Sequence, residues 1–166
     1  INKKLYRGST NFAGEIGHIV IDENGPLCGC GKKGCFEAFA SRKSITRNIE
    51  SDMSKNKKTV ITKLVKKGEP IKSKTLAKAV AQGDKLVIRH VEQGCHTIGR
   101  VLAGIANMLN LDMIILGGGM IEALESFMMP RIIESFNKFV LIDTTKKLKI
   151  YATKLGDDAA LYGGIV

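Results

Sequence analysis

The sequence has 166 residues, of which 44% are apolar and 25% charged, and its formal net charge is +10. This is the composition of a globular chain, at a length that predicts one domain or part of a larger one. No apolar run reaches the roughly 20 residues of a membrane span, and no basic segment followed by an apolar one marks a signal peptide. We therefore expect a cytoplasmic protein without a membrane-spanning segment.

The first half of the chain predicts short elements separated by loops. Residues 4–7 look like the end of a hairpin, residues 18–22 alternate like a short strand, and residues 36–49 predict a helix. Residues 55–78 hold nine lysines against one acid, and contain no arginine or aromatic residue. Apolar residues recur between the lysines at helical spacing. We interpret the stretch as two short lysine-coated helices with a break at residues 68–70, rather than as a nucleic-acid surface.

The second half completes an α/β pattern. The strongest helix signal runs over residues 84–109, where apolar residues keep a three-to-four spacing and Asp84 is a suitable N-cap. The continuous apolar run at residues 113–116 predicts a strand that is buried on both faces. Three further elements follow in chain order: two helices over residues 121–139 with the second starting at Pro130, a half-buried strand over residues 147–152, and an apolar segment after residues 156–158.

Three of the four cysteines lie within eight positions of a glycine-rich loop. Glycine lets a short loop fold back so that several thiolates meet, and soft thiolates with imidazole favour zinc. Together with His18, the residues Cys28, Cys30 and Cys35 make the Cys₃His set of a tetrahedral structural zinc site. The alternatives are free thiols or a disulfide. One disulfide would leave an odd cysteine, and nothing in the sequence indicates an oxidising compartment. Cys95 is expected to be an ordinary buried thiol on its helix.

Two carboxylates flank this loop. Glu15 precedes His18 by three residues, between Gly14 and Gly17, and Glu37 follows the last cysteine by two. Carboxylates accept hydrogen bonds from hydroxyl groups, so Glu15, Glu37 and the free ring nitrogen of His18 would suit a polyhydroxylated ligand. Two alternatives stay open: Glu15 orients a zinc-binding His18, or Glu37 only occupies the first turn of the next helix.

These residues resemble the signature of the ROK family (repressors, open reading frames and sugar kinases). The resemblance rests on Gly-Glu-Ile-Gly-His at residues 14–18 and Cys-x-Cys-Gly-x-x-Gly-Cys-x-Glu at residues 28–37, and it continues at residues 5–8, 116–119 and 155–160. It implies an α/β fold that is the C-terminal half of an actin-like (ribonuclease H-like) ATPase with a zinc knuckle. The implied residue roles are zinc binding by His18, Cys28, Cys30 and Cys35, sugar binding by Glu15, His18 and Glu37, and nucleotide binding by Gly117, Gly118 and Gly119.

The resemblance further implies a function for a longer protein, of which residues 1–166 would be a single C-terminal domain. That protein would be an ATP-dependent hexose kinase, with the 6-hydroxyl of glucose as the expected acceptor, Mg²⁺ on the phosphates, and a homodimeric assembly. The family's Asp-x-Gly-Gly-Thr motif and its base aspartate do not occur here, so we assign no catalytic residue and expect the chain alone to be inactive. Alternatives are a sugar-responsive transcriptional regulator that binds DNA, a kinase for another hexose such as N-acetylmannosamine or N-acetylglucosamine, and a zinc-stabilised interaction module.

Overall fold

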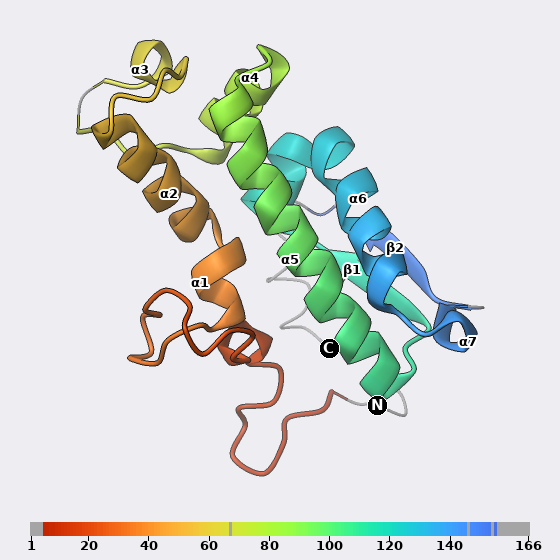
Figure 1. Cartoon of the computed structure of the whole chain (residues 1–166). Coiled ribbons are helices and arrows are strands. Elements are labelled where there is room, and N and C mark those ends of the chain that lie inside the picture. Colours follow the sequence, from red (N-terminus) through yellow and green to blue (C-terminus); the bar gives the residue numbers. More distant parts are fainter. Residues whose placement is uncertain (1–4, 67, 146, 154, 156–166) are drawn as a thin grey trace. The chain divides into compact units, whose positions relative to one another are not determined.

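A computed structural model of the chain describes residues 5–66, 68–145, 147–153 and 155 (Figure 1). The chain forms two compact units, Ile1–Phe39 and Ala40–Val166. Residues 5–7 of the expected hairpin end form no strand, and its residue 4 lies outside the described residues. The apolar segment expected after residues 156–158 also lies outside them. None of the described helices is long and apolar enough to cross a membrane.

The first unit is a loop structure with two short helical pieces, the 3₁₀ helix η1 (Ile16–His18) and the helix α1 (Phe36–Ala40). The strand predicted over residues 18–22 is wrong, because only Val20 forms a bridge, antiparallel to Cys35. The pairing cannot continue because the chain turns immediately afterwards, where the N–H of Gly25 donates to the carbonyl of Asp22 at 2.9 Å. The helix predicted over residues 36–49 is likewise divided.

The division lies at Ser41, which separates α1 from α2 (Arg42–Ser54). Ser41 has an extended backbone (φ −67°, ψ 154°), and its hydroxyl accepts a hydrogen bond from the N–H of Ser44 at 3.1 Å. A serine in this position caps a new helix better than it continues an old one. The apolar spacing carries through both helices, so periodicity alone did not reveal the break.

The lysine-rich stretch contains the two predicted helices, α3 (Ile61–Leu64) and α4 (Ser73–Ala81), with residues 68–70 between them outside any helix. Ile61 and Leu76 are buried, whereas the described lysines of the stretch are all exposed. The two short helices are confirmed, but only Lys63, Lys74 and Lys78 lie on them, and the other described lysines of the stretch lie in the segments around them.

The core of the second unit forms where α5 (Lys85–Leu109) packs against α6 (Gly119–Phe139), and these two helices lie side by side in Figure 1. Asp84 caps α5 as predicted, since its carboxylate accepts from the N–H groups of Leu86 and Val87. At the crossing, a Cβ on Gly99 would lie 2.5 Å from the carbonyl oxygen of Ile132. The close approach of the two helices therefore requires glycine at this position.

The predicted start of a new helix at Pro130 is wrong. Pro130 lies inside α6, and the interruption falls six residues earlier at Leu124, whose backbone (φ −132°, ψ 22°) is not helical. Leu124 is buried, so its side chain is held in the core while the helix changes direction. Proline removes one helical hydrogen bond, and that cost is tolerated here.

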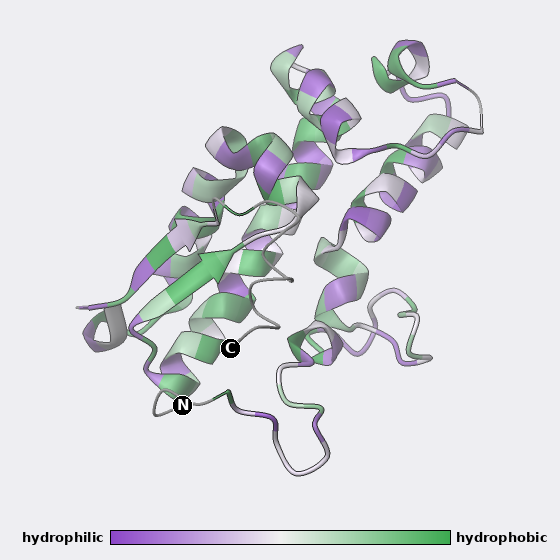
Figure 2. Ribbon diagram, turned by 180° about the vertical axis from the view of Figure 1, so that it is seen from behind, coloured by the Kyte–Doolittle hydropathy of each residue, from purple (hydrophilic) through white to green (hydrophobic). Residues whose placement is uncertain are grey.

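The sheet consists of two parallel strands, β1 (Met113–Leu116) and β2 (Lys149–Ala152), paired from Met113 with Lys149 to Leu116 with Ala152. Both predicted strands are confirmed, but burial of β1 on both faces is not. Ile114 is buried, whereas Ile115 is 62% exposed. Figures 1 and 2 show the helices on one face of the sheet and the apolar β1 open to view on the other. No described residues cover that second face. A short helix, α7 (Ile142–Thr145), lies between α6 and β2 in the chain.

Candidate functional site

The first unit brings the four predicted metal ligands together. One donor atom from each of His18, Cys28, Cys30 and Cys35 lies within 4.8 Å of the other three. The sulfurs of Cys30 and Cys35 are 3.6 Å apart, and Nδ1 of His18 is 3.7 Å from the sulfur of Cys28. Sulfur ligands at about 2.3 Å from a tetrahedral zinc ion lie about 3.8 Å from each other. The donor types and their spacing therefore fit zinc.

The backbone builds this cluster through tight glycine turns. The N–H of Cys28 donates to the carbonyl of Lys32 at 2.8 Å. This hydrogen bond closes the turn that contains Cys30 and precedes Cys35. Gly34 has a φ of +73°, and a Cβ there would lie 1.5 Å from the carbonyl oxygen of Asp22. Only glycine fits this position. Cys35 follows directly and is fully buried, with Cys28 and Ala38 beside it.

The electrostatics of the thiols differ between the surface and the interior of the loop. A hydrogen bond from the Lys32 backbone lowers the pKa of the exposed Cys30 thiol, and its sulfur neighbours lower it further. Burial raises the pKa of Cys35 to about 11, and the hydrogen bonds with Cys30 and Cys28 raise it too. A metal ion bound among the three sulfurs would supply the positive charge that favours their thiolate forms.

The predicted sugar-binding residues also meet in the first unit. Because Nδ1 of His18 faces the sulfurs, its Nε2 is left on the other side of the ring, 3.7 Å from Oε2 of Glu15. Glu37 lies in the first turn of α1, and its Oε2 is 3.5 Å from where a Cβ on Gly17 would stand. The side chains of Glu15 and His18 are 62% and 39% exposed. The three polar groups are therefore close together and open to a ligand.

The predicted nucleotide loop, Gly117–Gly119, connects β1 to α6, and its three glycines are exposed. Each differs in its local constraint. A Cβ on Gly117 would lie 2.8 Å from Cγ2 of Thr153, and Gly118 has a φ of +91°. Gly119 is free of both restrictions, since its Cβ would make only an ordinary contact with the hydroxyl of Ser73 at 3.6 Å. The local backbone therefore favours glycine at positions 117 and 118 independently of any bound ligand.

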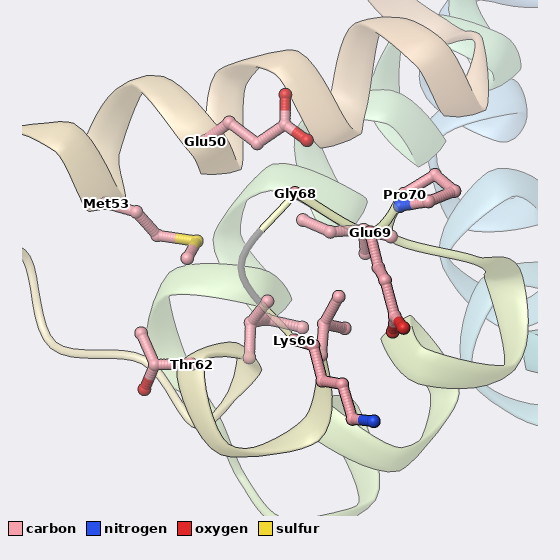
Figure 3. A pocket seen from close by; sticks show the side chains of 10 residues that line it. Glu50, Met53, Thr62, Lys66, Gly68, Glu69 and Pro70 are labelled. Atoms are coloured by element: carbon pink, nitrogen blue, oxygen red, sulfur yellow. The ribbon is translucent and has the colours of Figure 1, made fainter.

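The second unit holds a pocket that the sequence did not predict. It has a volume of about 530 Å³ and lies between the end of α2, helix α3 and residues 68–71 (Figure 3). Its walls include Met53, Ile61, Val65 and Ile71, and Figure 3 shows Glu50 and Lys66 among the side chains around it. None of the predicted site residues lines this pocket.

A charged cluster in the second unit also escaped the sequence analysis. The carboxylate of Asp52 in α2 accepts hydrogen bonds from Lys57 at 2.7 Å, from Nε2 of His90 at 2.9 Å, and from Arg89. These partners, Lys57 and His90 first, hold the pKa of Asp52 well below its usual range. Its partners in α5 are 37 and 38 residues away in the sequence, so no local pattern marked the cluster. Cys95, in contrast, is the buried thiol that was predicted, and burial raises its pKa to about 12.

Comparison with known proteins tests the resemblance. The family model described as the ROK family matches residues 1–166. This chain belongs to the ROK family. The fold is accordingly that of ROK family sugar kinases, of the actin-like ATPase type, with α and β elements.

The ROK family relatives include both kinases and regulators. The glucokinase of Thermotoga maritima is 30% identical over 159 residues, which is 96% of this chain and 50% of the relative. The xylose repressor of Caldicellulosiruptor bescii is 30% identical over 176 residues, which is 99% of this chain and 41% of the relative. Among solved structures, a ROK family glucokinase from Streptomyces griseus in complex with glucose and AMPPNP matches with a TM-score of 0.84 at 29% identity. That match covers 98% of this chain and 53% of the other. The chain thus spans about half the length of the relatives it matches.

Proposed function

We propose that this ROK family chain is the sugar-, zinc- and adenosine-binding part of an ATP-dependent hexose kinase whose acceptor is the 6-hydroxyl of glucose. The observation that carries the proposal is the geometry around His18, whose ring has one nitrogen toward the sulfur cluster and the other toward Glu15. The kinase relatives support the reaction class, and the Streptomyces griseus structure with glucose and AMPPNP supports the choice of sugar and nucleotide.

The gap between His18 and Glu15 suits a sugar hydroxyl. Nε2 and Oε2 are 3.7 Å apart, which is too long for a good direct hydrogen bond. A hydroxyl oxygen about 2.8 Å from each atom reaches both, accepting from the imidazole N–H and donating to the carboxylate. Glu37 offers a second acceptor near Gly17 for a neighbouring hydroxyl. Paired acceptors and one donor are the groups that fix the orientation of a polyhydroxylated ring.

Zinc would be held by Nδ1 of His18 and by the sulfurs of Cys28, Cys30 and Cys35. When bound, it supplies a cross-link that holds the loop together and fixes the imidazole tautomer. With Nδ1 engaged, His18 carries its proton on Nε2 and presents a donor to the sugar.

The residues of this chain would bind and orient the substrates rather than transfer the proton. Glu15, His18 and Glu37 would hold the sugar so that its 6-hydroxyl faces the γ-phosphate, and Gly117–Gly119 would let the backbone approach the nucleotide closely. Phosphoryl transfer depends mainly on such positioning and on charge stabilisation. We place the base and most phosphate contacts in the other half of the protein, and we assign no base within residues 1–166.

The substitution Glu37→Gln in the full-length protein tests the sugar site. It removes a charged acceptor without changing shape, so the dissociation constant for glucose should rise about tenfold or more in calorimetry. The zinc content should stay the same, because Glu37 is not a ligand. Glu23→Gln, which neutralises another exposed carboxylate of the same unit, serves as the control and should bind glucose normally. An unchanged affinity for glucose in Glu37→Gln would mean that Glu37 does not bind the sugar and only occupies the first turn of α1.

A ROK family transcriptional regulator is the second candidate, and the repressor relative that aligns with 99% of this chain favours it. A regulator could keep the same sugar site but would couple sugar binding to DNA release. The two functions are separated by giving the full-length protein glucose with ATP and, in a parallel experiment, its upstream DNA with and without glucose. Phosphate transfer supports the kinase, and sugar-dependent DNA release without transfer supports the regulator.

A further inference from the structure

Ser73 is a largely buried residue whose hydroxyl has no hydrogen-bond partner among the residues that the structure describes. Ser73 is the first residue of α4 and is 7% exposed. The oxygen itself reaches the surface, so it can donate a hydrogen bond to a ligand. The preceding residue, Lys72, makes no side-chain hydrogen bond that would cap α4. Both the hydroxyl and the start of the nine-residue helix therefore lack a local acceptor.

This hydroxyl lies against the glycine loop. The atom of Ser73 that a Cβ on Gly119 would meet is Oγ, at 3.6 Å, and no other atom beyond the neighbouring residues comes within 4 Å. Gly119 itself is exposed, so the space beside the hydroxyl is open at the loop. The exposed Lys72 and Lys74 flank Ser73, and the first turn of α4 contains no acid. The start of α4 is consequently positively charged, while the first turn of α6 carries one acid, Glu122.

We propose that the hydroxyl of Ser73 and the start of α4 bind a phosphate group of the nucleotide where it passes Gly119. The free N–H groups at a helix N-terminus attract anions, and here a hydroxyl donor and two lysines add to that attraction. An uncharged ribose or adenine would gain little from this field. The inference rests on the proposed kinase function and adds to it a phosphate contact outside the glycine loop.

Ser73→Ala in the full-length protein tests the contact. Calorimetry with ADP, with adenosine and with pyrophosphate separates the phosphates from the nucleoside. Loss of a hydrogen bond to a charged phosphate should raise the dissociation constants for ADP and pyrophosphate about tenfold, and leave the one for adenosine unchanged. Ser73→Thr keeps the hydroxyl and should restore binding. Thr75→Val, which removes a hydroxyl two residues further along α4, is the matched control and should behave as wild type.

Each other outcome has a definite meaning. If the wild-type protein binds ADP and Ser73→Ala binds it equally well, the phosphate contact is absent while the proposed function stands. If Ser73→Ala weakens adenosine as much as ADP, the hydroxyl serves the nucleoside or the loop, and the inference is overturned. If the wild-type protein binds glucose but neither ADP nor pyrophosphate, the kinase proposal itself fails.

Discussion

Three sulfur atoms and one ring nitrogen converge in the first unit, and their spacing is that of a closed structural metal site. We expect the purified protein to contain about one zinc ion per chain. Cys35→Ser should lose most of this zinc, as measured by elemental analysis, because the site falls to three ligands. Cys95→Ala removes a buried thiol from the second unit and should retain the metal. A wild-type protein free of zinc, or a Cys35→Ser variant that keeps it, would contradict the site.

The hydrogen bonds of Asp52 should make the free energy of unfolding depend on pH. Its hydrogen bonds with Lys57 and His90 lower its pKa in the folded chain, so the unfolded chain takes up the proton more readily. The stabilisation is therefore fully present above the ordinary aspartate pKa of about 4 and declines as the pH falls below it. Asp52→Asn should lower the free energy of unfolding by about 2 kcal/mol at pH 7.

Urea unfolding at pH 7 and at pH 3 measures this effect. The difference between wild type and Asp52→Asn should shrink at the lower pH, because the unfolded wild-type chain takes up a proton on Asp52 there while the folded chain does not. The exposed Glu23→Gln should show no such difference. A gap between the two proteins that stays constant from pH 7 to pH 3 would mean that Asp52 contributes through packing and not through its charge.

The sequence revealed residues that act locally and missed those that act across the fold. Asp84 was predicted as a cap because its partners are two and three residues away. The Cys/His cluster was predicted because glycines and cysteines alternate within one loop. Asp52 has partners in another helix, and Ser73 gains its significance only from Gly119, so neither contact leaves a short-range pattern.

At the scale of elements, the crossing of α5 and α6 is a close contact that a single substitution can test. A Cβ on Gly99 would collide with the backbone of Ile132 and Phe136, which cannot move as a flexible side chain does. Gly99→Ala should therefore lower the free energy of unfolding by about 2 kcal/mol in chemical denaturation, despite the better helix propensity of alanine.

Gly104 offers a matched control on the same helix. A Cβ there would have no neighbour within 4 Å, so Gly104→Ala gains only helix propensity and should stabilise by up to about 1 kcal/mol. If both substitutions shift stability in the same direction, the helices do not cross as closely as the structure indicates.

Helix breaks were harder to predict than helices. Proline suggested a break at Pro130, but the core holds Leu124 in a non-helical conformation instead. At Ser41 a capping hydrogen bond interrupts a continuous apolar pattern. Periodicity records which residues face the core, whereas a break depends on where the helix must turn to stay in contact with it.

At the scale of the whole molecule, the net charge comes mainly from one segment of the chain. The nine lysines of residues 55–78 supply most of the charge of +10, and those that the structure describes are exposed. Ile115, on the exposed face of β1, was expected to be buried. The continuous apolar sequence of β1 predicted burial on both faces. An apolar run does not show which face of a strand the other elements cover. The residues predicted to bind zinc and sugar, by contrast, do lie close together within the first unit.

The most direct test of the account is the transfer of phosphate from ATP to glucose by the full-length protein, followed as formation of glucose 6-phosphate. The kinase proposal predicts turnover of about 1–100 per second, lost when Mg²⁺ is removed. The chain of residues 1–166 alone should bind zinc but transfer no phosphate. A full-length protein that binds glucose and zinc, yet transfers phosphate to no hexose, would contradict the proposal.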